Sequence, residues 1–250
     1  MDPRAATEAS RGRLLVLDYP GHRTEARVCD LHLEDYGYTP TSMLTSPLPT
    51  ELDGRRYAER LRVRISGPAT PAVAVLAYCA SARIAREVAA MLPGRPALVL
   101  FDAEDVTEET IASAYLSAIA EYNPAVVAAA ACPGELRTDP DTALCAMLGR
   151  ISELATAAFR AEGCDPAESD SLGRQTTAAW QDWLTHLIAA YRSEPARWDG
   201  RILHVTSAGY RQTGGWWDSP SVRAVQCDVG QAELLRSATA RAAVLDFLAD

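Results

Sequence analysis

The chain has 250 residues, of which 48% are hydrophobic, and a formal net charge of −9. This length suits one large α/β domain, and the hydrophobic share is enough for a sizeable core. The negative charge argues against nucleic acid and against an anionic membrane surface as partners. Residues 1–13 are polar and no run of about 18 apolar residues follows, so we expect a cytoplasmic protein.

In the first hundred residues, short apolar runs alternate with amphipathic segments. Residues 1–12 are expected to form a loose arm, and residues 19–24 a loop. The patterns predict strands at 13–18, 38–45, 73–77 and 96–102, and helices at 25–36, 53–65 and 82–91. The continuous apolar run at 96–102 is typical of a central parallel strand.

A long helical block follows and separates these strands from the last two. The pattern from Thr107 to Tyr191 is almost entirely helical, with breaks near Cys132 and across residues 163–173. We predict strands at 201–207 and 222–227, then a final helix from Gln231 to the C-terminus. This alternation indicates a single α/β domain over residues 1–250, with a mostly parallel sheet and a helical lid inserted at 107–195.

The most informative segment is Ala77-Tyr78-Cys79-Ala80-Ser81. A strand that turns through small residues into a helix has the layout of a nucleophile elbow, whose usual pattern is G-x-S-x-G. Cys79 occupies the nucleophile position, at a helix N-terminus that favours partial thiolate character. The backbone N–H groups of Ala80 and of Gly21 in the preceding loop are the candidate oxyanion donors.

Other candidate site residues lie near the predicted edge of the sheet. Asp102 ends the next strand and is a candidate orienting acid, with a helix N-cap as its structural alternative. His22 follows Gly21 and could reach the thiol, whereas His204 lies inside an apolar strand and is expected to be a hydrogen-bonded core residue. The acidic residues from Glu104 to Glu109 are expected to form a solvated helix start.

Three aromatic residues are candidates for a pocket that holds an acyl chain or a pantetheine arm: Tyr78, Trp183 and Trp216. The six cysteines contain no C-x-x-C pair, so we expect free thiols rather than disulfides or a zinc site. The chain has no phosphate-binding loop, dinucleotide fingerprint or cluster of metal ligands. We therefore expect neither a metal nor a resident cofactor.

Three features resemble the thioesterases of polyketide and nonribosomal peptide assembly lines, a branch of the α/β-hydrolase superfamily. They are the elbow AYCASA, the strand PALVLFDAE that ends near Asp102, and the helical block before Ile202, where that family carries its lid. The resemblance implies an α/β-hydrolase fold and a substrate carried on the phosphopantetheine arm of an acyl or peptidyl carrier protein. Several of these enzymes carry their triad acid where Asp102 stands, but Gln231 occupies the position of the triad histidine.

A thiol needs less help from a base than a serine hydroxyl does. Thioester exchange between two thiols is nearly thermoneutral, whereas hydrolysis requires an activated water. These residues therefore favour transfer of an acyl group between thiols, through Cys79, over its release into water. The chain also resembles members of this fold that shuttle aminoacyl groups on a cysteine, which implies acyl or aminoacyl transfer between carrier-bound thioesters in natural-product biosynthesis. Two alternatives remain: a type II or cyclising thioesterase with His22 or His204 as a displaced base, and a catalytically degenerate, hydrolase-like binding protein.

Overall fold

The computed structural model describes residues 11–21, 25–65, 71–125, 135–194, 198–211 and 222–250. The chain divides into two compact units. The first unit comprises residues 1–47, 58–105 and 195–250, and the second comprises residues 48–57 and 106–194. Helix α1 (Gly54–Val63) is shared between the units, with Tyr57 as the last of its residues in the second.

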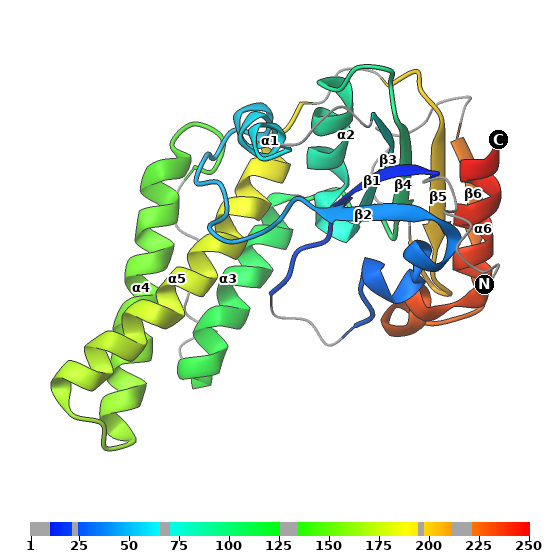
Figure 1. Cartoon of the computed structure of the whole chain (residues 1–250). Helices are drawn as coiled ribbons and strands as arrows, with labels where there is room; N and C mark the ends of the chain where they lie inside the picture. Colours follow the sequence, from blue (N-terminus) through cyan, green and yellow to red (C-terminus); the bar gives the residue numbers. More distant parts are fainter. Residues whose placement is uncertain (1–10, 22–24, 66–70, 126–134, 195–197, 212–221) are drawn as a thin grey trace, which may run out of the picture. The chain divides into compact units, whose positions relative to one another are not determined.

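The first unit is built on a six-stranded sheet in which every neighbouring pair of described strands is parallel (Figure 1). The strand order is β2-β1-β3-β4-β5-β6. The strands are β1 (Gly12–Leu17), β2 (Tyr38–Ser42), β3 (Ala72–Tyr78), β4 (Ala97–Phe101), β5 (Ile202–Thr206) and β6 (Val222–Gln226). The predicted strands are therefore confirmed, although β2 ends earlier than expected.

The strand order indicates where on this sheet a ligand would bind. From β1 the chain first crosses to β2 on one side and then returns to form β3 on the other. In open parallel sheets, ligands bind outside the carboxyl ends of the strands, at the point where the crossover direction reverses. The carboxyl end of β3, which is followed by Cys79, lies at this point.

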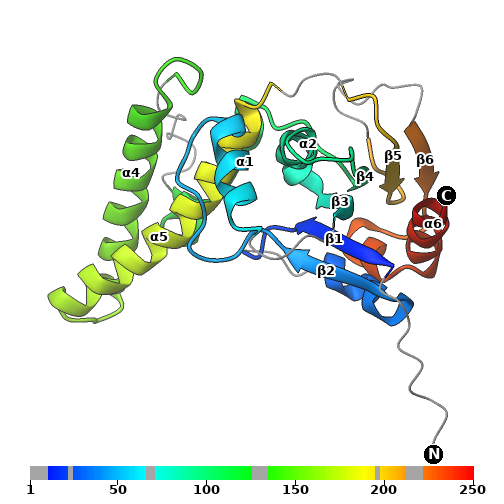
Figure 2. The same cartoon turned by 45° about the horizontal axis from the view of Figure 1, so that its top comes forward.

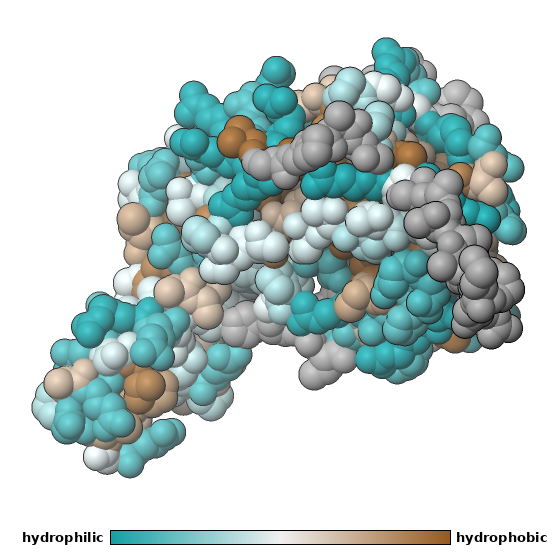
Figure 3. Space-filling view, viewed as in Figure 1, coloured by the Kyte–Doolittle hydropathy of each residue, from teal (hydrophilic) through white to brown (hydrophobic). Residues whose placement is uncertain are grey.

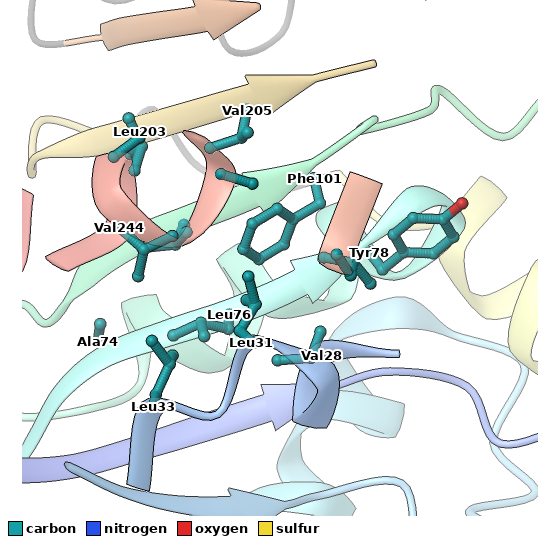
Figure 4. Packing of buried hydrophobic residues seen from close by; sticks show 14 of the residues in the cluster. Val28, Leu31, Leu33, Ala74, Leu76, Tyr78, Phe101, Leu203, Val205 and Val244 are labelled. Carbon is teal, nitrogen blue, oxygen red and sulfur yellow. The ribbon is translucent and has the colours of Figure 1, made fainter. Parts of the chain in front are cut away.

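Hydrophobic side chains cover both faces of the sheet. On one face, Leu76 and Phe101 pack in a buried cluster with Val244 of α6 (Ala238–Ala249) (Figure 4). Val75 and Ala77 alternate with these strand residues and so point to the opposite face, which is covered by α2 (Figure 2). A sheet covered by helices on both faces explains why β3 and β4 are almost uniformly apolar.

The second unit contains α3 (Glu108–Tyr122), α4 (Pro140–Ala161) and α5 (Pro166–Tyr191), which pack against one another (Figure 1). The side chains of Thr107, Asp139 and Asp165 each accept a backbone N–H bond in the first turn of the helix that follows. The predicted break across 163–173 is shorter than expected because Asp165 caps a helix that already begins at Pro166. The break near Cys132 lies outside the described residues, and the lid role of 107–195 stays a prediction.

Two predicted helices differ from the observed elements. Residues 25–36 form two 3-10 turns, Val28–Leu31 and Leu33–Tyr36, separated by His32 with a φ of +50°. A left-handed residue at that position prevents one continuous α-helix. The final α-helix begins at Ala238 rather than Gln231, because the Ser237 hydroxyl caps it by accepting the N–H of Ala240.

The surface of the described residues is mostly polar. Figure 3 shows hydrophilic residues over much of the face drawn, with small and separate hydrophobic areas. Among the described residues, the exposed large hydrophobic side chains are Tyr36, Val63 and Val73. None of the helices in the described segments is long and apolar enough to cross a membrane.

Candidate functional site

The turn after β3 has the sharp geometry expected of an elbow. Tyr78 is extended, whereas Cys79 has a φ of +52°, in the left-handed region. Such a conformation costs a non-glycine residue on the order of 1–3 kcal/mol and is enriched at functional sites. The chain then passes through a short 3-10 turn, Cys79–Ser81, into α2 (Ala82–Ala90). The predicted strand-to-helix turn is therefore confirmed.

A second strained residue lies at the end of the neighbouring strand. Asp102 directly follows β4 and has a φ of +40°. Its buried carboxylate accepts two hydrogen bonds from Ser207, one from the backbone N–H and one from the hydroxyl, both at 2.8 Å. Burial raises the pKa of Asp102, and the two bonds from Ser207 oppose that rise. Asp102 thus ties the end of β4 to the segment after β5 instead of capping a helix.

A pocket of about 290 Å³ lies at this edge of the sheet. Every residue that lines it belongs to the first unit: Cys79, Asp102, Glu104, Ser207, Ala208, Gly209, Tyr210, Arg211 and Gln231. Gln231, which stands at the expected histidine position, thus faces the same pocket as the thiol and Asp102. No histidine is among the described residues that line this pocket.

The partner of the Cys79 thiol is Glu104. The sulfur donates a hydrogen bond to Glu104 Oε2 at 3.1 Å, and the Glu104 backbone N–H donates to the Cys79 carbonyl at 3.3 Å. Burial, followed by the charge of Glu104, raises the pKa of the thiol far above its ordinary value, whereas a bond from the Ala80 backbone lowers it. The expected partial thiolate is therefore wrong, because burial and the carboxylate outweigh the helix N-terminus.

The segment between Asp102 and Glu104 is held by two side chains, one from the middle of β5 and one from the segment that follows β5. The Ala103 N–H donates to His204 Nε2 at 3.3 Å, and the Ala103 carbonyl accepts the hydroxyl of Tyr210. The two rings meet edge to face with centroids 5.3 Å apart. Burial lowers the pKa of His204 to about 4, so the ring is neutral at pH 7. Its predicted core role is confirmed, and the Ala103 amide occupies the lone pair that a displaced base would need.

The remaining elbow candidates take different positions. Tyr78 is buried in the hydrophobic cluster that also contains Phe101 (Figure 4), and it is not among the described residues that line the pocket, so its predicted substrate contact stays a prediction. Ala80 is also buried, and its backbone bonds to the Cys79 sulfur. Gly21 lies in the segment after β1 and is not among the described lining residues.

The other candidates do not lie in the described pocket. Trp183 belongs to the second unit, where it stacks on the buried His186 with ring centroids 5.9 Å apart. His22 and Trp216 lie outside the described residues. The roles predicted for His22, Trp183 and Trp216 therefore stay predictions.

Sequence reasoning missed Glu104. The acidic run was expected to be a solvated helix start, but the helix begins at Glu108 with Thr107 as its cap. Glu104 instead turns toward the thiol, and Asp105 forms an ion pair with Arg83 at 2.5 Å. The position of Glu104 in the sequence was a signal that could have identified it. Glu104 lies two residues after Asp102, at the carboxyl end of the strand next to the one that carries the elbow.

No protein-family model matches the chain, and no curated protein matches it. Solved structures do resemble it. The NocB thioesterase domain, in covalent complex with a fluorophosphonate nocardicin G analog, is 17% identical with a TM-score of 0.52, over 96% of both chains. The Vlm2 thioesterase domain bound with a dodecadepsipeptide is 15% identical with a TM-score of 0.50, over 95% of this chain and 96% of that one.

A third similar structure is ALR0039 from Nostoc sp. PCC 7120, assigned to the α/β hydrolases. It is 15% identical with a TM-score of 0.51, over 95% of this chain and 90% of that one. Identities this low establish the fold. The protein thus has the α/β-hydrolase fold in its thioesterase-like form, as the sequence motifs predicted.

Proposed function

We propose that this protein is a thioesterase-like enzyme that transfers acyl or aminoacyl groups between the pantetheine thiols of carrier proteins, with Cys79 as the nucleophile. One observation carries the proposal: the Cys79 thiol lies on a strained strand-to-helix turn and lines a pocket of about 290 Å³. The similarity to thioesterase domains supports an acyl-transfer chemistry on this fold.

The reaction has two symmetrical halves. The Cys79 sulfur attacks the carbonyl carbon of a pantetheine thioester, and the Ala80 N–H stabilises the oxyanion that forms. Collapse of this intermediate breaks the bond to the pantetheine sulfur, which leaves as a thiol, and the acyl group stays on Cys79. A second pantetheine thiol then attacks the Cys79 thioester and reverses these steps. One thioester is broken and one is formed in each half, so neither half is strongly uphill.

The groups in the pocket favour a thiol acceptor over water. Gln231 stands at the histidine position, and its amide is not a base at neutral pH. Water is a weaker acid than an ordinary thiol by about 7 pK units, so it depends far more on a strong base for activation. A pocket whose described lining holds no histidine therefore suits exchange between thiols better than hydrolysis.

Intact-protein mass spectrometry tests this proposal. Wild type and the Cys79→Ala variant are incubated with a panel of acyl- and aminoacyl-pantetheine thioesters. We expect an adduct of one acyl group on wild type and none on Cys79→Ala. The adduct persists in buffer and is discharged by added pantetheine or by holo-carrier protein. Cys145→Ala, which removes an exposed thiol in the second unit, is the matched control and keeps the adduct.

Other outcomes of the same experiment separate the alternatives. An adduct that disappears in buffer while free acid accumulates identifies a thioesterase that releases its acyl group into water. Absence of an adduct with every thioester in the panel contradicts both enzymatic functions. If Cys79→Ala then still binds a carrier protein with wild-type affinity, the protein is a binding protein with a hydrolase-like fold.

A further inference from the structure

We infer that Glu104 is the proton acceptor and donor for Cys79, in the role that histidine has in Ser-His-Asp sites. The inference rests on the proposed acyl transfer and assigns a further catalytic residue to it. Its basis is the 3.1 Å hydrogen bond from the thiol to Glu104 Oε2, in a pocket whose described lining contains no histidine.

The carboxylate is held in place by the segment that carries it. Its own backbone N–H bonds to the Cys79 carbonyl, so Glu104 is joined to the elbow residue twice. The preceding residue, Ala103, is bonded on one side by His204 and on the other by Tyr210. A base positioned through such a network needs little rearrangement when a substrate arrives.

Among the described charged and titratable groups around the Cys79 thiol, Glu104 is the one suited to accept its proton. Both oxygens of Asp102 already accept hydrogen bonds from Ser207. Burial and the nearby negative charges raise the pKa of Tyr210 to about 12, so its hydroxyl stays protonated and donates to Ala103. Arg211 also lines the pocket, but a guanidinium cannot accept a proton from a thiol.

The proposed step balances without any further reactant. At rest, the pair holds one proton, on the sulfur of Cys79. As sulfur attacks the thioester carbonyl, this proton moves to Glu104 Oε2 and the negative charge passes to the oxyanion. When the intermediate collapses, the protonated Glu104 returns the proton to the departing pantetheine sulfur. The products are the Cys79 thioester, a free pantetheine thiol and ionised Glu104.

Replacement of Glu104 by Gln has two effects that move in opposite directions. Glu104→Gln removes the base, so acylation of Cys79 by a thioester that labels wild type is expected to slow by about 10²–10⁴-fold. The same change removes a negative charge that raises the thiol pKa, so alkylation of Cys79 by iodoacetamide at pH 8 is expected to become faster. If Glu104 acted on Cys79 only through its charge, Glu104→Gln would instead make both acylation and alkylation faster.

Both rates are measured on the same protein samples. Acylation is followed by intact-protein mass spectrometry, and alkylation is followed on the peptide that contains Cys79. Glu109→Gln, an exposed carboxylate in the same acidic run, is the matched control and changes neither rate. Glu104→Asp keeps a carboxylate and is expected to recover part of the acylation that Glu104→Gln loses.

The dependence of acylation on pH gives a separate measurement. A histidine base would produce a step in rate centred near its ordinary pKa of about 6.5, because the imidazole must first lose its proton. Because no histidine lines the described pocket, we expect no such step in wild type between pH 6 and 8.

Several outcomes would overturn the inference while the proposed function stands. One is an acylation rate of Glu104→Gln that equals or exceeds that of wild type, and another is a step near pH 6.5 in wild type. If Glu104→Gln slows both acylation and alkylation, the substitution has distorted the pocket, and Glu104→Asp then provides the test. Acylation of Glu104→Asp that is faster than that of Glu104→Gln supports the inference. Equal acylation rates in these two variants overturn it. If no thioester acylates wild type, the proposed function itself fails.

Discussion

The side chain of Gln231 helps to decide what chemistry the described pocket can perform. It lines the pocket together with Cys79 and Asp102, at the position where the sequence resemblance leads us to expect a histidine. Its amide can donate and accept hydrogen bonds but cannot take a proton at neutral pH. The oxygens of Asp102 are correspondingly used by Ser207. Gln231 and Asp102 therefore do not form the histidine–acid pair that the sequence resemblance leads us to expect.

We predict that Gln231→His moves the site toward hydrolysis. An imidazole in the pocket supplies a base for water, and its cationic form lowers the pKa of a neighbouring thiol. Acylated Gln231→His is expected to release free acid at least tenfold faster than acylated wild type does. Iodoacetamide is expected to modify its Cys79 faster at pH 7. Mass spectrometry of the adduct over time measures release, with Gln231→Asn as the control. Equal adduct lifetimes in both variants would contradict this account.

At the residue scale, the sequence contained part of the site. The positions of Cys79 and Asp102 could be predicted, because both directly follow apolar runs that form neighbouring parallel strands. The contact between Glu104 and the thiol could not. It depends on the left-handed turn at Asp102 and on the bond from Ala103 to His204, a residue 101 positions away. Sequence patterns report local periodicity and carry no direct information on such distant contacts.

At the scale of elements, two glycines in helices have opposite surroundings. Gly54 begins α1, and a Cβ atom there would lie 2.7 Å from the Ala189 carbonyl oxygen and 2.5 Å from Ser193 Cβ. Ser193 Cα also lies at 2.7 Å, and backbone atoms of the same unit have little freedom to move away from an added methyl group. Gly149 lies exposed in α4, and a Cβ there would meet no other described atom within 4 Å.

Alanine at these two positions should therefore change stability in opposite directions. Gly54→Ala is expected to lower the free energy of unfolding by about 1–3 kcal/mol, because the added methyl group overpacks the helix contact. Gly149→Ala is expected to raise it by about 1 kcal/mol, because alanine restricts the unfolded chain and favours a helix. Urea unfolding of both variants beside wild type measures the changes. Destabilisation by Gly149→Ala, or none by Gly54→Ala, would contradict the packing described here.

Among the elements, the strands were the easiest to predict. β3 and β4 are buried along almost their whole length and are therefore built from apolar residues. A short, continuous apolar run of this kind is readily predicted to be a buried strand. The segment at 25–36 was predicted wrongly as one helix, and its buried Val28 and Leu31 have an i, i+3 spacing that also suits an α-helix. The left-handed His32 between the two turns carries no signal in a sequence pattern.

At the scale of the whole molecule, the described residues of each unit include one buried histidine. His204 lies in the first unit and His186 in the second, and burial lowers the pKa of each to about 4. His186 Nδ1 lies 3.3 Å from the hydroxyl of Tyr57, within the second unit. Histidines in an unfolded chain have a pKa near 6.5. In the folded protein, both rings therefore stay neutral at pH values well below 6.5.

This difference makes the protein less stable in acid. Between about pH 6.5 and 4, the unfolded chain binds protons at His186 and His204 while the folded chain does not, so the free energy of unfolding falls as pH decreases. Each histidine is expected to contribute a loss of about 3 kcal/mol. Asp102 acts in the opposite sense: its pKa is raised in the folded state, so its contribution to stability is present at low pH and lost as pH rises.

Urea unfolding between pH 4 and pH 7 tests this balance. Wild type is expected to lose stability steadily below pH 6.5. His204→Gln is expected to lose less, because its side-chain oxygen can still accept the Ala103 N–H but cannot be protonated in this range. His32→Asn removes an exposed histidine at a left-handed position that asparagine tolerates, and it is the matched control. If His204→Gln has the same pH dependence as wild type, His204 is not neutralised by burial. That result would contradict the assignment of a neutral His204 ring as the acceptor of the Ala103 N–H.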